Sequence, residues 1–154
     1  MAKGVLGLDI GGANIKAVLA IPSNEGIEVL RVVRVYAPVW IIGREGLRAK
    51  LAEIAESLSA SVDKLYVAAT MTAELSDVYR VKREGVHHIV DTVVEVFKGA
   101  ERVAFVTSKI ELVDPGEAKR RYLDVAAANW AASAWLLKEM CKKWNTANSV
   151  FIDI

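Results

Sequence analysis

The spacing of apolar positions predicts three strands at the start of this 154-residue chain. Residues 5–10 and 15–21 are apolar and rich in β-branched side chains, as strands are. Residues 27–36 alternate apolar with charged positions, which is typical of a half-buried strand. Short turns at residues 11–14 and 22–26 join the three segments, so we expect an antiparallel meander.

Helical spacing begins later in the chain and then alternates with buried strands. Apolar residues recur every three or four positions over residues 47–58 and again over residues 86–97, where Gly99 ends the pattern. A third helix is predicted over residues 125–143, with Asp124 as its cap. Further strands are predicted at residues 65–69, 103–107 and 149–154. The order β-β-β-α-β-α-β-α-β predicts a mixed α/β sheet with helices on its faces.

Composition excludes several classes of protein. Hydrophobic residues make up 53% of the chain and charged residues 25%, which excludes a disordered protein. No apolar run is long enough to cross a bilayer, and the first residues lead into Asp-Ile-Gly-Gly instead of a signal-peptide cleavage site. The net charge of +1 provides no field that would attract nucleic acid. We therefore expect a cytoplasmic protein that binds neither membranes nor nucleic acid.

The turn at residues 11–14 has two interpretations. It is either a hairpin between two core strands, with Asp9 acidic by chance, or a phosphate-binding turn. Its glycines do not open a helix, so it is neither a P-loop nor a dinucleotide fingerprint. Glycine amides can still approach an anion, because no Cβ obstructs them. Beside them Asp9 could hold a hydrated Mg²⁺, while Asn14 adds a hydrogen-bond donor and Lys16 a positive charge.

The motif and the element order together resemble one superfamily. The segment DIGGANIKAV, at residues 9–18, resembles the first phosphate motif of the actin-like ATPases, which include sugar kinases, acetate kinases and the Hsp70 ATPase domain. The resemblance implies a ribonuclease-H-like mixed sheet of five strands, the first three antiparallel and the next two parallel. It also implies Mg²⁺ at Asp9, and ATP or a diphosphate ester held by Asp9, Gly11, Gly12, Ala13, Asn14 and Lys16.

Two further segments narrow the resemblance. The stretches TMTAELSD, at residues 70–77, and AAANW, at residues 126–130, resemble the archaeal-type hydantoinase/oxoprolinase-related family. Its better-understood members are enzymes of methanofuran biosynthesis. The family reaction joins an aminomethylfuran diphosphate to a glutamyl-tyramine unit and displaces pyrophosphate. The resemblance therefore implies a transferase that handles a diphosphate ester.

That chemistry assigns roles to residues 70–84, which we expect to form a mobile loop at the cleft. The enzyme must neutralise pyrophosphate and deprotonate or orient a phenol. The catalytic candidates are Glu74, Asp77, Arg83 and Glu84, and the substrate-binding candidates are Thr70, Thr72, Lys82 and Asn129. The alternative is that the acidic residues only face solvent, and that Glu84 only favours the dipole of a helix.

The last six residues predict a change of domain. Actin-like enzymes bind their ligand between two similar domains, and the second domain opens with another Asp-containing phosphate hairpin. Residues 149–154, SVFIDI, resemble the start of that second domain, with Asp153 as its aspartate. We therefore expect a first domain at residues 1–148 and the first strand of a second domain at residues 149–154. An unpaired apolar strand there predicts self-association or pairing with a separate C-terminal half.

Three functions follow from these resemblances. The first is part of a methanofuran-type transferase with a small-molecule phosphate ligand. The second is part of a sugar or small-molecule kinase in which Asp77 or Glu74 deprotonates a hydroxyl. The third is a binding or assembly module that keeps the fold without catalysis.

Overall fold

The computed structural model describes residues 3–24, 26–58 and 62–152, and they form one mixed α/β fold. Its centre is a six-stranded sheet with the order β3-β2-β1-β4-β5-β6. The strands are β1 (Lys3–Ile10), β2 (Asn14–Ser23), β3 (Gly26–Tyr36), β4 (Lys64–Met71), β5 (Arg102–Val106) and β6 (Leu112–Val113). The predicted antiparallel meander of β1, β2 and β3 is confirmed, as is the parallel pairing of β1 with β4 and of β4 with β5.

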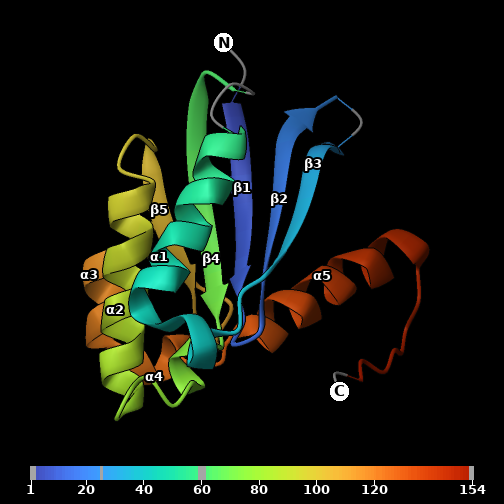
Figure 1. Cartoon of the computed structure of the whole chain (residues 1–154). Helices are drawn as coiled ribbons and strands as arrows, with labels where there is room; N and C mark the ends of the chain where they lie inside the picture. Colours follow the sequence, from blue (N-terminus) through green and yellow to red (C-terminus); the bar gives the residue numbers. More distant parts are fainter. Residues whose placement is uncertain (1–2, 25, 59–61, 153–154) are drawn as a thin grey trace.

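The helices lie between and after these strands along the chain. They are α1 (Val39–Leu58), the 3₁₀ turn η1 (Ala73–Leu75), α2 (Lys82–Val96), α3 (Pro115–Arg120), α4 (Tyr122–Val125) and α5 (Asn129–Trp144). In Figure 1, α1 and α2 lie in front of the sheet, while α5 begins near the tips of β1 and β4 and runs away from the sheet. Among the described residues, no helix has the length and apolar character needed to cross a membrane.

One face of the sheet carries the core. Along β1 the side chains alternate, so that Leu6, Leu8 and Ile10 are buried while Val5, just before Leu6, is 42% exposed. The buried set joins the apolar stripes of α1 and α2 in one cluster, which includes Leu51 and Ile89. Burial of this cluster fixes which face of each strand points inward, and therefore which side chains stand on the other face.

The opposite face, which we call the open sheet face, is only partly covered. It carries Val5, Val18, Ala68 and Leu112, and three of these are large apolar side chains that remain exposed. Helix α5 reaches this face through its first half, where Trp135 lies beside Ala68 around a shared cavity. Helices therefore lie on both faces of the sheet, as predicted, but they cover the open sheet face less completely than the core face.

The structure corrects several predicted boundaries. The sheet has six strands instead of five, because β6 is a two-residue strand too short to show an alternating pattern. The first helix begins at Val39 instead of residue 47, and Gly43, with φ of 67°, interrupts its periodicity. Residues 149–152 form no strand, since no other described strand lies beside them, and residues 153 and 154 lie outside the described residues.

The predicted helix over residues 125–143 is divided in the structure. Helix α4 ends at Val125 and α5 begins at Asn129. Between them Ala127 has a φ of 49°, the left-handed conformation that ends a helix. Asp124 is not a cap: it lies inside α4 and pairs with Arg121.

Close packing of α2 on η1 generates a testable prediction. A Cβ at Gly85 would lie 2.6 Å from the Cβ and 2.7 Å from the Cα of Glu74. We expect Gly85→Ala to lower the free energy of unfolding by about 1–3 kcal/mol, because backbone must move to admit the methyl group. Gly99→Ala is the control, because a Cβ there meets nothing within 4 Å. Urea denaturation of both variants tests this, and equal stabilities would contradict the packing described.

Candidate functional site

The site lies where β1 and β4 end side by side. Their parallel register places Asp9 beside Thr70 on the open sheet face. Asp9 Oδ2 accepts a hydrogen bond from Lys16 Nζ at 2.8 Å, across the register pair of β1 and β2. Asp9 Oδ1 and Thr70 Oγ1 are buried and have no hydrogen-bond partner among the described residues. Buried polar atoms in native proteins are nearly always hydrogen-bonded, so this pair marks a place suited to a polar ligand.

The glycine turn stands directly beyond Asp9 and is held by backbone bonds. Gly11 N–H donates to the Asn14 carbonyl at 3.0 Å, and the carbonyls of Gly12 and Ala13 accept from Val39 and Ala37 at 2.8 Å. A Cβ at Gly11 would lie 2.8 Å from the Asn14 carbonyl oxygen, so that position requires glycine. At Gly12 a Cβ would meet nothing within 4 Å. The turn is therefore fixed on its inner side and open at Gly12.

The threonines of the TMTAELSD segment reach the same place. Thr72 N–H donates to the Ile10 carbonyl at 2.9 Å, which extends the pairing of β1 with β4 by one residue. The hydroxyl of Thr72 would lie 3.7 Å from a Cβ placed on Gly11. The structure thus brings Asp9, the glycine turn, Thr70 and Thr72 together, as the sequence analysis expected.

Glu74 is the buried carboxylate of the region. Its side chain belongs to η1 and is 2% exposed. Oε1 accepts a hydrogen bond from Ala127 N–H at 2.8 Å, and Oε2 has no partner among the described residues. Burial raises the pKa of Glu74, while the Ala127 bond and the Lys82 charge oppose that rise. Glu74 therefore joins the TMTAELSD segment to the AAANW segment, which the sequence analysis treated separately.

Glu84 has a different environment. It pairs with Arg44 of α1 and accepts the backbone N–H of Arg80 at 2.8 Å, and both contacts lower its pKa. The Arg44 guanidinium also donates to the Val78 carbonyl and lies 5.1 Å from the centre of the Tyr79 ring. Glu84 thus fastens the end of the 70–84 segment to α1.

Tyr79 continues this network toward α2. Its hydroxyl bonds His88 Nδ1 at 2.8 Å, and burial raises the pKa of Tyr79 to about 12. Burial and the Arg44 charge lower the pKa of His88, so the imidazole is neutral at pH 7. The segment after η1 is therefore tied down by polar contacts from two helices.

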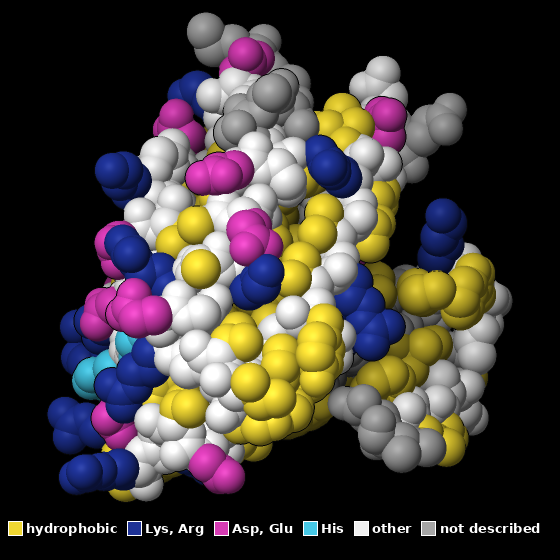
Figure 2. All heavy atoms as spheres, viewed as in Figure 1, with side chains coloured by type: hydrophobic (Ala, Val, Ile, Leu, Met, Phe, Trp, Pro, Cys, Tyr) yellow, Lys and Arg dark blue, Asp and Glu magenta, His cyan; other side chains and the backbone are white. Residues whose placement is uncertain are grey.

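The remaining candidates lie at the edge of the region. Asp77 is an exposed turn residue, Lys82 and Arg83 are exposed in the first turn of α2, and Asn129 is the half-buried first residue of α5. Figure 2 shows basic and acidic side chains mixed on the side of the molecule where α2 lies, and hydrophobic ones over the start of α1, where Trp40 and Ile41 are exposed. The structure gives none of these four candidates a hydrogen bond to Asp9 or to the glycine turn.

Sequence reasoning missed two contributors. Thr107 directly follows β5, is fully buried, and accepts the N–H groups of Lys109 and Glu111 at 3.3 and 3.2 Å. Thr107 could have been identified from the sequence by its position directly after β5, the third of the parallel strands. Arg44 follows Gly43. A glycine inside a helical segment indicates a possible break in the helix, but the sequence does not show which residues such a break brings together.

The donor set around Asp9 fits Mg²⁺ better than a transition metal. No group of three or more His, Cys, Asp or Glu side chains close enough to hold a metal occurs among the described residues. Mg²⁺ is usually bound through one or two carboxylates and phosphate oxygens, and keeps several waters. One carboxylate with an unpaired oxygen, beside an open glycine turn, satisfies that requirement.

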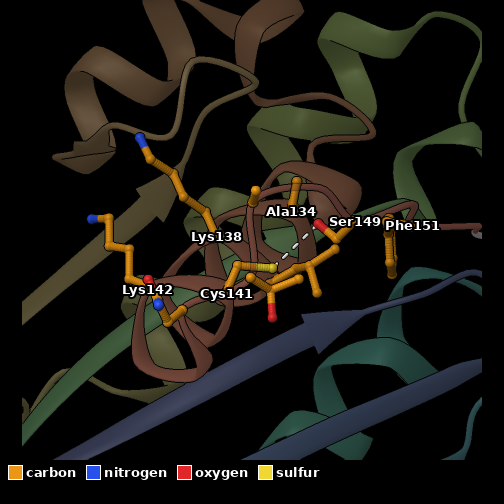
Figure 3. A pocket seen from close by; sticks show the side chains of 10 residues that line it. Ala134, Lys138, Cys141, Lys142, Ser149 and Phe151 are labelled. Atoms are coloured by element: carbon orange, nitrogen blue, oxygen red, sulfur yellow. Dashed lines mark hydrogen bonds between the residues drawn. The ribbon is translucent and has the colours of Figure 1, made fainter.

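A separate cavity lies elsewhere on the molecule. It has a volume of about 530 Å³ and lies between the second half of α5 and residues 145–151. Figure 3 shows Cys141 and Ser149 facing each other across it, with Sγ 3.2 Å from Oγ, while the amino groups of Lys138 and Lys142 point away from Ser149. It contains none of the candidate residues and is not part of this site.

Comparison with known proteins gives one family and one curated relative. The hydantoinase/oxoprolinase family model matches residues 66–154. The (4-{4-[2-(gamma-L-glutamylamino)ethyl]phenoxymethyl}furan-2-yl)methanamine synthase of Methanocaldococcus jannaschii is 38% identical over 138 residues. The alignment covers 90% of this chain and 38% of that synthase, so the chain spans little more than a third of its relative.

Solved structures resemble the chain more distantly. A Ppx/GppA family member from Aquifex aeolicus has a TM-score of 0.44 and 13% identity, over 60% of this chain and 33% of its own. A putative sugar kinase from Cytophaga hutchinsonii has a TM-score of 0.41 and 19% identity, over 63% of this chain and 34% of its own. The family match and the curated relative, and not these folds, support the functional assignment.

The buried carboxylate gives a prediction about pH. Because the folded chain raises the pKa of Glu74, folding favours its protonated form. Its contribution to stability is therefore complete below the unfolded pKa and is lost as the pH rises through the raised pKa. We expect the wild-type free energy of unfolding to fall over that range relative to Glu74→Gln, which cannot ionise.

The measurement is urea denaturation across pH 4 to 8 on both proteins. Glu74→Ala should cost about 1–3 kcal/mol at every pH, because Ala127 N–H loses its acceptor. A constant difference between wild type and Glu74→Gln across the range would show that Glu74 is not held in a desolvated state.

Proposed function

This chain belongs to the hydantoinase/oxoprolinase family, and from that membership we propose that it forms the diphosphate-binding part of a transferase. The proposed reaction joins an aminomethylfuran diphosphate to a phenol and releases pyrophosphate. The single observation that carries the proposal is a pair of buried oxygens, Asp9 Oδ1 and Thr70 Oγ1, that have no hydrogen-bond partner among the described residues and stand next to the open Gly12 turn. The chain covers 38% of its curated relative, so the proposal concerns the part of the site that this chain supplies.

The phosphate end of the ligand would lie at the glycine turn. Amides of Gly12 and Ala13 and the amide side chain of Asn14 are the proposed donors, while Gly11 N–H holds the turn through its bond to the Asn14 carbonyl and Lys16 supplies positive charge. Mg²⁺ bound at Asp9 would neutralise charge on the leaving pyrophosphate. Thr70 Oγ1 can donate a hydrogen bond to a phosphate oxygen without first losing another partner, since it has none among the described residues.

Bond breaking in this reaction places negative charge on the leaving group. The bond between the furylmethyl carbon and the diphosphate oxygen breaks, and its electron pair leaves with pyrophosphate. The phenol oxygen then forms the new ether bond and releases its proton to a base. We assign Lys82 and Arg83 to the leaving diphosphate, because both are exposed cations in the first turn of α2 and the charge of Lys82 acts on Glu74.

The choice of base follows from the surroundings of the carboxylates. Glu84 is paired with Arg44, which lowers its pKa and weakens it as a base. Glu74 has a raised pKa and an oxygen with no hydrogen-bond partner among the described residues, which makes it a stronger base than an ordinary carboxylate. Asp77 is exposed on the adjoining turn. We therefore propose Glu74 or Asp77 as base and Glu84 as a positioning residue, with Asn129 contacting the acceptor.

Gly12 provides the direct test. A Cβ at this position meets no atom within 4 Å, so Gly12→Val should change the melting temperature little. The branched side chain would occupy the space of the phosphate, and we expect binding of Mg²⁺-pyrophosphate to be lost. Isothermal titration calorimetry measures this, with Gly99→Ala as the matched control and Mg²⁺-ATP as the competing ligand. Wild-type affinity in Gly12→Val would show that the turn is only a hairpin.

A further inference from the structure

An apolar cavity outside the phosphate site lies between the open sheet face and the first half of α5. Its volume is about 410 Å³, which is within the range of small-molecule sites. Ala68 of β4 and Val106 of β5 line it from the sheet, and Ala132 and Trp135 line it from α5. Glu111 is the one charged side chain among its lining residues.

Ala68, which lines this cavity, belongs to a row of small residues on the sheet. The register places Gly7 of β1, Ala68 of β4 and Ala104 of β5 in one row across three neighbouring strands. Beside this row the indole of Trp135 stays 47% exposed. A large aromatic side chain on a partly open apolar cavity offers a flat surface on which a second ring can stack.

The cavity adjoins the proposed phosphate site along β4. Ala68 and Thr70 lie two positions apart on the same face of the strand, a separation of about 6.6 Å along its axis. Thr70 stands beside Asp9, so the cavity and the phosphate site are neighbours on the open sheet face. A ring attached to a diphosphate through one methylene group has about this reach.

The charges at the rim of the cavity are paired with one another. Arg121 pairs with Glu111, and Thr107 also contacts the same carboxylate oxygen. Arg121 further pairs with Asp124, which Lys109 approaches at 3.7 Å. Each carboxylate at this rim therefore has a cationic partner, and what the cavity itself offers a ligand is apolar surface.

We propose that this cavity binds the aromatic ring of the diphosphate ester, with Trp135 as the stacking surface and Ala68 as the floor. The assignment rests on the proposed function and adds to it the position of the donor ring. The donor ring fits better than the phenol, because only the donor ring is held within one methylene group of the phosphates. Ala68 and Trp135 are then specificity-determining residues for the size of that ring.

The test uses two probes that differ only by the ring. These are methyl phosphonophosphate and furan-2-ylmethyl phosphonophosphate, whose carbon–phosphorus bond cannot ionise. With Mg²⁺ and the full chain, calorimetry should show the furan probe binding about tenfold more tightly, because only it buries an apolar ring. Ala68→Leu fills the cavity and Trp135→Ala removes the stacking surface, so both should reduce this ratio to about one without weakening the methyl probe.

Two tryptophan variants locate the ring. Trp144 lies on α5, as Trp135 does, but does not line the cavity, so Trp144→Ala should keep the tenfold ratio of affinities for the two probes. Trp40 lies at the start of α1, so Trp40→Ala should also keep this ratio. Loss of the ratio in Trp40→Ala, or its survival in both Ala68→Leu and Trp135→Ala, would overturn the assignment. Circular dichroism confirms that each variant is folded.

A phosphate-free probe separates the two proposals. If 2-methylfuran shifts the indole resonance of Trp135 in wild type and not in Ala68→Leu, while neither phosphonophosphate binds, the cavity assignment stands and the proposed function fails. If the methyl probe binds and the furan ring adds nothing in wild type, the phosphate site stands and the cavity assignment fails.

Discussion

The parallel pairing of β1 with β4 is the constraint on which the site depends. Its register sets Asp9 beside Thr70 and continues through the Thr72 N–H bond to Ile10. A shift of β1 by one residue would turn Asp9 into the core and Leu8 onto the open sheet face. Burial of Leu6, Leu8 and Ile10 prevents that shift, so packing on one face of the sheet positions the polar groups on the other.

A hydrogen bond of Glu74 connects the end of β4 with the second half of the chain. Its bond to Ala127 N–H joins η1, at the end of β4, to the left-handed residue between α4 and α5. Gly85 leaves the room that this arrangement needs, because any larger residue would overlap Glu74. The direction in which α5 leaves the sheet is therefore linked to a carboxylate beside the proposed phosphate site. The same helix carries Trp135, so the position of the proposed ring subsite depends on this buried contact.

Much of this arrangement could be predicted from local patterns. Apolar, β-branched runs at residues 5–10 and 15–21 and alternation at residues 27–36 predicted the meander, and the Asp-Ile-Gly-Gly segment at its first turn predicted where a phosphate site would lie. Long-range contacts could not be predicted, since nothing near Glu84 indicates Arg44, forty residues away, and nothing near Glu74 indicates Ala127. The run of alanines at residues 126–128 has high helix propensity, so the sequence did not indicate that the helix would be interrupted at Ala127. Residues 149–152, the described part of the strand predicted at residues 149–154, form no strand, because an apolar pattern forms a strand only beside a hydrogen-bonding partner and no other described strand lies beside them.

Chemical-shift mapping of Mg²⁺-pyrophosphate on the ¹⁵N-labelled chain tests the central claim most directly. The claim is that the ends of β1 and β4 and the turn between β1 and β2 form one anion site. The account predicts the largest amide shifts at Gly11, Gly12, Thr70 and Thr72, and small shifts along the second half of α5. Shifts confined to α5 and residues 145–151, or no shifts at all, would contradict it.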